Sequence, residues 1–318
     1  MIATDSMSSA LPALPSSGRS LRGVKWFLLL TLLTLIYGSH APLISLSKVD
    51  GRVPFSASSC VVLIELAKLL VSLGTLLAFE ELSGSHLSVS WVLVAPYAVP
   101  ALLYAFNNHL VVFMQDYMDP SSFQVLSNMK IASTALLYTS CLGKRLRPGQ
   151  WLALALLVAA GVCHSYASLG WEDLNGLHIT AWGLLLVLLY SFISGLAAVY
   201  TERVLKAQRL PLSLQNLFLY LFGVGINLAS HVASVGGDQG LLEGYSWTVW
   251  LIVASQAANG LLMSLVMKHG SGITRLFVIS AAMLVNGVLS WGLLGLQLTP
   301  YFLLPVLLIA AAVYLYYR

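Results

Sequence analysis

The sequence predicts an all-α integral membrane protein with ten transmembrane helices, arranged as two inverted five-helix repeats. Three observations carry this prediction: an apolar composition, ten apolar segments of membrane-spanning length, and loop charges that alternate between the two sides of the bundle. Of the 318 residues, 58% are hydrophobic and 9% are charged, against roughly 25% charged in an ordinary soluble domain. Lipid is therefore the expected surrounding, and neither a soluble globule nor a disordered chain fits this composition.

Polar or Gly/Pro-rich breaks divide the chain into segments of about 20 largely apolar residues, the length that crosses a bilayer. The first segment is longer than the apolar core of a secretory signal and lacks a small-residue cleavage site, which predicts an uncleaved helix. Residues 1–22 are expected to be a disordered cytosolic tail, and residues 23–318 one transmembrane domain. The predicted spans are 25–46, 56–79, 89–114, 121–142, 150–168, 179–204, 212–234, 246–267, 272–296 and 299–317.

The loop charges predict the orientation of the bundle. An excess of Lys and Arg marks the cytosolic side of a membrane protein, so both termini are expected to face the cytosol. The opposite side has only Lys48 and Arg52, with the acidic residues Asp50, Asp116, Asp119, Glu172, Asp173, Asp238 and Glu243. The termini and even-numbered loops contain Arg19, Arg22, Lys25, Lys144, Arg145, Arg147, Arg203, Lys206, Arg209, Lys268, Arg275 and Arg318.

A weak internal similarity places the repeat at five helices. Leu156–Val162 reads LLVAAGV and Leu307–Val313 reads LLIAAAV, each in the last helix of one half. The fourth and ninth spans each contain a cation, Lys130 and Arg275. An odd number of helices per repeat gives the two copies opposite topologies, a recurrent way to build a transporter. The repeats are predicted at about residues 23–170 and 178–318.

Three charged residues lie deep inside predicted spans, where an ionisable group is unfavourable. Lys130 lies roughly 13 Å into its helix, too far for easy snorkelling to an interface. It is either a structural partner of some carbonyl or carboxylate, or part of a site for an anionic ligand. Glu65 and Lys68 are three residues apart on one helix face and can neutralise each other, as a structural pair that rearranges during transport. Glu65 is the only carboxylate expected at depth.

Other polar residues in the spans leave two interpretations open. Arg275 follows Gly270-Ser271-Gly272 by about one turn; it either snorkels to the cytosolic interface or directs its guanidinium inward at a phosphate. Intramembrane amides either join helices or line a polar cavity. These amides are Asn107, Asn108, Asn128, Asn216, Asn227, Asn259 and Asn286.

Several function classes have no support in the sequence. Cys60, Cys141 and Cys163 have no metal-ligand or disulfide spacing, so no metal or cofactor is expected. No hydrolase, metalloprotease or phosphate-loop motif is present, which argues against an enzyme or an ATP-driven pump. The thinly spread net charge of +4 forms no nucleic-acid-binding stripe. Deep cations with polar amides and almost no deep acid favour the passage of an anion.

Two segments have a recognisable sequence. Val99–Asn108 reads VPALLYAFNN, and Phe123–Ile131 reads FQVLSNMKI. They resemble the nucleotide-sugar transporters of the drug/metabolite transporter superfamily, in particular the subfamily that includes the CMP-sialic acid and UDP-galactose carriers. The resemblance covers about residues 25–317. Further matching segments are Glu65–Leu69, Ser194–Tyr200, Gln215–Tyr220 and Lys268–Phe277.

This resemblance implies the ten-helix drug/metabolite transporter fold in a Golgi or ER membrane. It also implies alternating-access exchange, in which a nucleotide sugar enters the lumen as a nucleoside monophosphate leaves. The expected partners are these two ligands, the lipid bilayer, and a homo-oligomer or hetero-oligomer with other nucleotide-sugar transporters. No nucleic acid is expected.

The resemblance also implies site residues. Lys130 matches the family's phosphate-binding lysine, and Arg275 falls where a second phosphate-binding cation, usually Lys, is placed. The remaining implied substrate contacts are Asn108, Phe123, Ser127, Asn216, Tyr220 and Ser264. Two residues depart from the family pattern: Phe123 stands where Tyr is common, and Phe222 where the CMP-sialic acid carriers have Ser. The nucleotide half of the site therefore matches the family, whereas the sugar half is altered.

The resulting hypothesis is a Golgi-membrane exchanger for a pyrimidine nucleotide-linked sugar or alditol, joined to UDP, CMP or CDP, with CDP-ribitol as one example. The alternative is a family member that no longer transports and acts as a membrane interaction partner or scaffold. Binding of UMP or CMP distinguishes the two.

Overall fold

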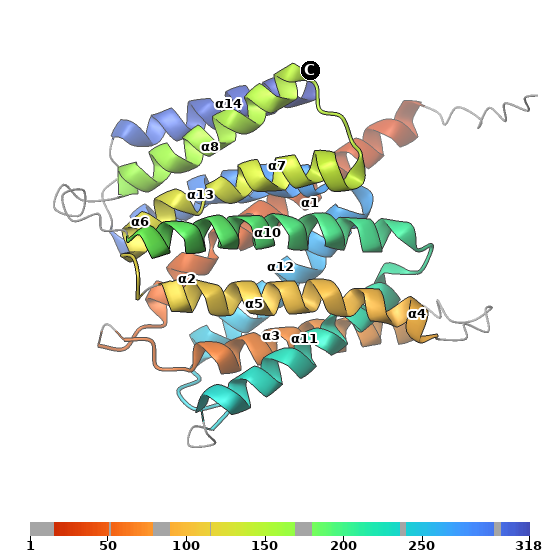
Figure 1. Ribbon diagram of the computed structural model, residues 1–318, viewed down its shortest axis with the longest axis vertical. Helices are drawn as coiled ribbons and strands as arrows, with labels where there is room; N and C mark the ends of the chain where they lie inside the picture. Colours follow the sequence, from red (N-terminus) through yellow and green to blue (C-terminus); the bar gives the residue numbers. More distant parts are fainter. Residues whose placement is uncertain are drawn as a thin grey trace, which may run out of the picture.

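The structure, a computed structural model, describes residues 16–50, 52–78, 90–114, 116–168, 180–235, 240–295 and 300–318. Within these ranges the chain is helical apart from short connections and one isolated bridge between Val49 and Arg52. The helices lie side by side in one bundle (Figure 1), so the all-α prediction is confirmed. Residues 1–15 of the predicted tail, and Glu172, Asp173 and Asp238 of the charge pattern, lie outside the described residues.

Among the residues that the structure describes, seven helices are long and apolar enough to cross a membrane, and they coincide with seven of the predicted spans. The first candidate span, Gly23–Leu46, includes a short helix, α2 (His40–Leu46), that follows α1 after Ser39. Because α1 already begins at Ser16, it also includes residues 16–22 of the predicted tail. The long helices are α1 (Ser16–Gly38), α3 (Ala57–Ala78), α8 (Pro148–Ser168), α10 (Ala181–Ala207), α11 (Leu212–Val235), α12 (Trp247–His269) and α13 (Gly272–Leu294).

The three other predicted spans are divided into shorter helices. In the third, Pro96 lies in a 3₁₀ turn and cannot donate a backbone hydrogen bond. The number of ten spans therefore stays a prediction. The pieces are α4 (Trp91–Val94), η1 (Ala95–Tyr97) and α5 (Ala98–Met114) in the third span, α6 (Pro120–Leu126) and α7 (Met129–Leu142) in the fourth, and η2 (Pro300–Phe302) and α14 (Leu303–Tyr317) in the last.

Two tightly packed helix pairs form opposite sides of the bundle. Helix α8 packs against α14 on one side, and α3 packs against α11 on the other (Figure 1). Between them, α10 packs against α5 and α7, and α1 packs against α12 and α13. The polar residues considered below lie on these inner helices and on α3 and α11.

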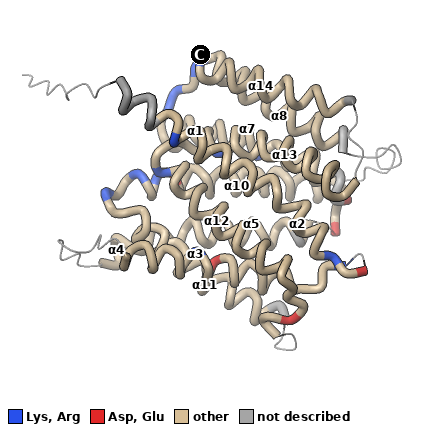
Figure 2. The backbone as a smooth tube through the Cα atoms, turned by 180° about the vertical axis from the view of Figure 1, so that it is seen from behind, with Lys and Arg blue, Asp and Glu red and all other residues tan. Residues whose placement is uncertain are grey.

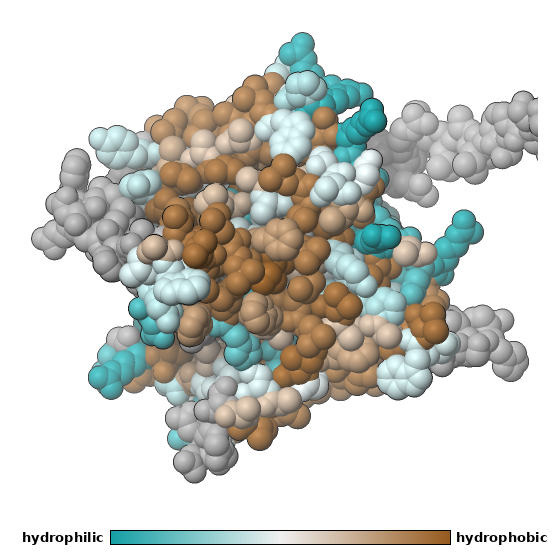
Figure 3. All heavy atoms as spheres, in the orientation of Figure 1, coloured by the Kyte–Doolittle hydropathy of each residue, from teal (hydrophilic) through white to brown (hydrophobic). Residues whose placement is uncertain are grey.

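The surface has the distribution expected of a membrane protein. Most Lys and Arg residues lie at the end of the bundle that contains the C-terminus, and most Asp and Glu residues lie toward the other end (Figure 2). Apolar side chains cover the middle of the face in Figure 3, with polar ones toward its ends. Trp91 and Trp247 are 78% and 84% exposed, typical of side chains at a membrane interface. The chain is therefore a multi-pass membrane protein.

Candidate functional site

Lys130 lies in the first turn of α7, inside the predicted fourth span. Its side chain is partly buried, and the described part of the chain offers its ammonium neither a hydrogen bond nor an ion pair. Its backbone oxygen is occupied, because it accepts hydrogen bonds from Thr134 Oγ1 at 2.6 Å and Ser133 Oγ at 3.1 Å. The ammonium thus remains available for an anionic ligand. The backbone N–H of Lys130 is occupied, because it donates to the Ser127 oxygen at 3.2 Å.

The side chain of Asn128 produces the interruption between α6 and α7. Its Nδ2 donates to the backbone oxygens of Gln124 at 3.1 Å and Val125 at 3.0 Å. In a continuous helix these oxygens would accept from the backbone N–H groups four residues later. The asparagine amide therefore replaces backbone donors, as short polar side chains do, and α7 starts afresh at Met129.

Helix α8 accommodates this interruption at Gly161. A Cβ atom at Gly161 would lie 2.1 Å from Asn128 Oδ1, and Asn128 Nδ2 also donates to Ser165 Oγ at 3.4 Å. Gly161 belongs to the segment LLVAAGV, and the matching position of LLIAAAV is Ala312.

Arg275 lies in the first turn of α13 and turns inward. Its Nη1 donates to the Tyr104 hydroxyl at 3.4 Å, and its guanidinium lies 5.9 Å from the centre of that ring. Its Nε is buried and has no hydrogen-bond partner. The guanidinium also acts electrostatically on Tyr190 of α10. Of the two interpretations left open by the sequence, this geometry favours the inward-directed side chain.

Two further aromatic rings meet between α6 and α10. Phe123 of α6 and Tyr190 of α10 meet edge to face, with ring centroids 5.3 Å apart. Asn108 is exposed and lies one helical turn after Tyr104, hence on the same face of α5. Ser127 is partly buried, and its hydroxyl donates to the backbone oxygen of Gln124 at 3.1 Å. Helices α5, α6, α10 and α13 thus bring a guanidinium, phenols and a phenyl ring together, and Lys130 follows on α7.

Glu65 and Lys68 form an ion pair on α3. Lys68 Nζ lies 2.6 Å from Glu65 Oε1 and 4.3 Å from the centre of the Tyr220 ring. Glycines make room for both side chains: a Cβ at Gly223 would lie 2.6 Å from Glu65 Oε2, and one at Gly260 would lie 2.7 Å from Lys68 Cδ. Tyr220, an implied substrate contact, is 4% exposed and packs against Lys68 instead. Any gating role of the pair stays a prediction.

The remaining implied contacts lie on α11 and α12. Asn216 is buried, and its Oδ1 has no hydrogen-bond partner. It lines a cavity of about 280 Å³ between α3, α11 and α12, together with Ser72 and Thr75. Ser264 is 1% exposed and donates to the backbone oxygen of Leu261 at 2.8 Å. The structure therefore separates two groups, one around Arg275 and Tyr104 and one on α3 and α11 around Lys68 and Asn216. None of the polar contacts within the described residues joins Lys130 to either group.

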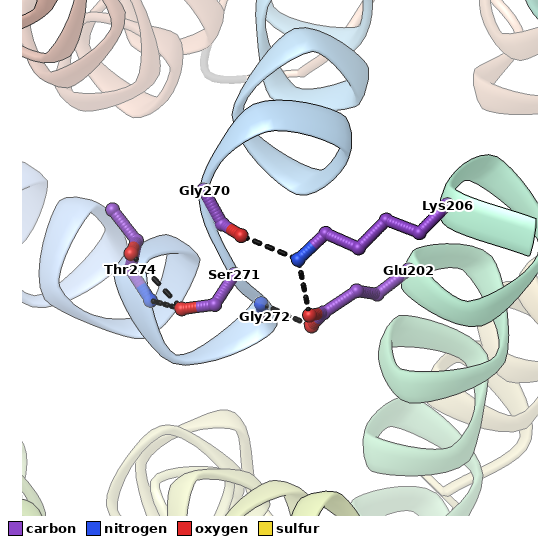
Figure 4. A network of polar contacts seen from close by, with 6 residues as sticks. All are labelled: Glu202, Lys206, Gly270, Ser271, Gly272 and Thr274. Carbon is purple, nitrogen blue, oxygen red and sulfur yellow. Dashed lines mark hydrogen bonds and ion pairs between the residues drawn. The ribbon is translucent and has the colours of Figure 1, made fainter. Parts of the chain in front are cut away.

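A second buried carboxylate lies near the end of the predicted sixth span, and the expectation that Glu65 is the only one at membrane depth stays a prediction. Glu202 of α10 is 1% exposed and pairs with Lys206 at 2.7 Å. Its Oε2 accepts a 2.5 Å hydrogen bond from the Gly272 N–H at the start of α13 (Figure 4). Lys206 Nζ donates to the Gly270 oxygen at 2.5 Å. The spacing of Glu202 and Lys206 predicts a helix pair, but nothing in the sequence indicates the contact with Gly272.

The sequence analysis also did not predict Tyr104 or Tyr190 as residues of the site. Tyr104 lies within the segment VPALLYAFNN, four residues before Asn108, and this spacing could have identified it. Tyr190 belongs to no segment that indicated function. No group of three or more His, Cys, Asp or Glu side chains that could hold a metal ion occurs within the described residues.

Comparison with known proteins identifies the family of similar chains. Residues 22–317 match the family model described as nucleotide-sugar transporter. Proteins named "Probable UDP-sugar transporter protein SLC35A4" from Danio rerio, Xenopus tropicalis and Homo sapiens are 68%, 54% and 53% identical to this chain. The alignments cover 95%, 95% and 96% of this chain, and 96%, 94% and 97% of those relatives.

A solved structure has the same fold. A protein crystal structure with 15% sequence identity superposes with a TM-score of 0.69, over 91% of this chain and 94% of that chain. At this identity the likeness shows the fold alone.

Proposed function

This chain belongs to the nucleotide-sugar transporter family, and from this premise we propose that it exchanges a pyrimidine nucleotide-linked sugar or alditol for a nucleoside monophosphate across the Golgi membrane. Its relatives are named as transporters, not as enzymes. The substrate class is thus a nucleotide sugar. The particular base, sugar and exchange partner are the proposed part.

The observation that carries the proposal is the placement of two cations in first helical turns. Lys130 is the second residue of α7 and Arg275 the fourth of α13. The start of α13, which follows an extended cap residue, also favours an anion near Arg275, as helix N-termini do inside transporters. The ammonium of Lys130 has no partner in the described ranges, and Arg275 keeps a buried unpartnered Nε. Both are suited to bind phosphate oxygens.

Exchange follows from the same charges. Two cations with no carboxylate partner among the described residues resist movement through lipid, because buried unpaired charge is strongly unfavourable. A nucleotide sugar neutralises them in one direction, and a nucleoside monophosphate neutralises them for the return. Obligatory exchange is therefore the expected mode of transport.

The sugar half of the site separates this chain from the sialic acid carriers. Phe222, at a position where those carriers have Ser, packs against an apolar cluster that includes Phe218 and Tyr220. This arrangement supports a smaller or linear moiety on UDP, CMP or CDP. Phe123 keeps a ring that can stack on a base but has no hydroxyl to donate.

We further propose that the chain is built from two inverted repeats and has both termini in the cytosol. The packing supports the repeats, because contacts recur when each helix is exchanged for its counterpart five predicted spans away. Helix α5 packs against α11 as α12 packs against α3, and α10 packs against α7 as α1 packs against α13. The concentration of Lys and Arg at the end with the C-terminus supports the orientation (Figure 2).

Uptake by the purified protein in proteoliposomes tests the function. Vesicles preloaded with UMP or CMP are offered a panel of UDP-, CMP-, CDP- and GDP-linked sugars and CDP-ribitol. We expect uptake of one pyrimidine class, dependent on the preloaded monophosphate. Uptake without preloading would contradict exchange. No uptake, with no thermal stabilisation by any nucleotide, would favour the non-transporting scaffold.

A further inference from the structure

The ion pair between buried Glu202 and exposed Lys206 has no part in the proposed phosphate contacts, yet Glu202 contacts Gly272, three residues before Arg275. Glu202 is 1% exposed, and a carboxylate at this burial requires compensation. Two groups supply it: Lys206 of the same helix at 2.7 Å, and the Gly272 N–H of α13 at 2.5 Å (Figure 4). The second contact joins α10 to α13 through two residues that are 70 positions apart in the sequence.

The contact caps the start of α13. The first N–H groups of a helix have no partner within it, and a carboxylate there is favourable because of the helix dipole. Ser271 contributes the local cap by accepting from the Thr274 N–H at 3.1 Å. Glu202 adds a cap from another helix, so the first turn of α13 is fixed relative to α10.

Glycines allow the close approach. A Cβ at Gly272 would lie 3.1 Å from Glu202 Oε2, and one at Gly270 would lie 2.8 Å from the Val266 oxygen. Lys206 Nζ donates to the oxygen of Gly270 at 2.5 Å. The connection between α12 and α13 is thus held against α10 through both of its glycines.

Helix α10 also holds the partner of Arg275. Thr201, the neighbour of Glu202, has its Oγ1 3.5 Å from the Tyr104 hydroxyl, and that hydroxyl accepts from Arg275 Nη1 at 3.4 Å. Two adjacent residues of α10 therefore contact the surroundings of Arg275 at two points. Glu202 fixes the backbone that carries Arg275, and Thr201 contacts the phenol that the guanidinium reaches.

We propose that Glu202 is a positioning residue for Arg275, and that the Glu202–Gly272 contact aligns the guanidinium for the substrate phosphate. This inference rests on the proposed phosphate role of Arg275. Lys206 neutralises Glu202, so the carboxylate holds the helix without competing with a phosphate for the guanidinium. Preorganisation of this kind raises affinity by reducing the ordering needed on binding.

A double-mutant cycle tests the positioning role. Affinities for UMP and CMP are measured from ligand-induced thermal shifts of the purified protein, for the wild type, Glu202→Gln, Arg275→Ala and the double variant. We expect Glu202→Gln to weaken binding about tenfold, but to have little further effect once Arg275 is replaced, because coupled residues are non-additive. Lys268→Gln is the control, since Lys268 contacts Gln215 at 2.6 Å on the other side of the same connection. Its effect should be independent of Arg275.

Two further measurements keep the outcomes distinct. Amide hydrogen exchange over residues 272–276 should accelerate in Glu202→Gln, because the first turn of α13 loses its cap from α10. Gly272→Ala perturbs the same contact and leaves both charges in place, so it should reproduce the weaker binding if Glu202→Gln fails to fold. The positioning role alone would be overturned by unchanged amide hydrogen exchange over residues 272–276, or by losses of affinity that add up in the Glu202→Gln/Arg275→Ala double variant. A wild type that no nucleotide stabilises would overturn the proposed function together with it.

Discussion

The two regions that contain deep charge differ in how that charge is compensated. On α3, Lys68 has Glu65 at 2.6 Å and the Tyr220 ring at 4.3 Å. On α7, the Lys130 ammonium has no hydrogen bond or ion pair among the described residues. A charge that has a partner inside the bundle can be structural. A charge that has none is unfavourable there, and its presence indicates a role in ligand binding. Loss of the lysine should therefore lower stability in the first region and weaken ligand binding in the second.

Loss of Lys68 has the largest expected effect, and the effect is on stability. Lys68→Ala leaves Glu65 unpaired beside Gly223, and breaking a buried pair costs about 3 kcal/mol, at the low end of the usual range because the Glu65 side chain keeps 18% exposure. Thermal unfolding in detergent measures the loss. The double variant Glu65→Gln/Lys68→Met, which leaves no unpaired charge, should recover most of it. A stable single variant would show that the pair is not structural.

Loss of Lys130 should affect ligand binding and leave the empty protein as stable as before. Lys130→Ala removes a charge-assisted contact of about 2 kcal/mol, roughly a thirtyfold loss of nucleotide affinity. Counterflow in UMP- or CMP-loaded vesicles measures transport, and the thermal midpoint without ligand measures stability. Lys144→Ala, at the exposed end beyond the same helix, is the matched control. Full exchange by Lys130→Ala would refute the phosphate role.

Gly161 tests how the position of Lys130 is fixed. In Gly161→Ala the new methyl would lie 2.1 Å from Asn128 Oδ1, and such overpacking costs about 1–2 kcal/mol. The midpoint of thermal unfolding should fall by a few degrees. The same substitution at Gly149, where the nearest atom to a Cβ is 3.9 Å away, should leave it unchanged. Equal midpoints for both variants would mean that the interruption does not depend on this contact.

Arg275→Lys has the smallest expected effect, because the positive charge remains. A lysine loses the planar fork that can hold two phosphate oxygens, as well as its geometry toward Tyr104. We expect about a tenfold rise in the apparent KM for the nucleotide sugar, near 1.4 kcal/mol. An unchanged KM would show that a positive charge alone suffices at this position, and that the planar guanidinium has no special role there.

Short-range relationships in the sequence predicted much of this structure. Apolar segment length placed seven helices, and the three-residue spacing of Glu65 and Lys68 correctly indicated that they could meet. The interruption before Lys130 was not predicted, because Asn128 was interpreted as a residue that joins helices or lines a cavity. It instead bonds mainly to the backbone of its own segment, and whether it can do so depends on the space left by Gly161.

Long-range contacts account for the rest. The Arg275–Tyr104 contact spans 171 residues and the Glu202–Gly272 contact 70, and one sequence contains no record of either. From the sequence, Glu202 was interpreted as one of the charges at the ends of spans, because its contact with Gly272 could not be predicted. Its burial depends on the position of α13, which local spacing does not determine. The roles of the substrate residues stay predictions for the experiments above.

The ion pair on α3 has an electrical consequence. Moving one elementary charge through 100 mV involves about 2.3 kcal/mol of work, but Glu65 and Lys68, joined at 2.6 Å, move through a field with no net charge. Movement of α3 with this pair joined therefore carries no net charge from the pair through the field. Current measured during the proposed exchange would report the other charges that move, including those on the proposed cargo.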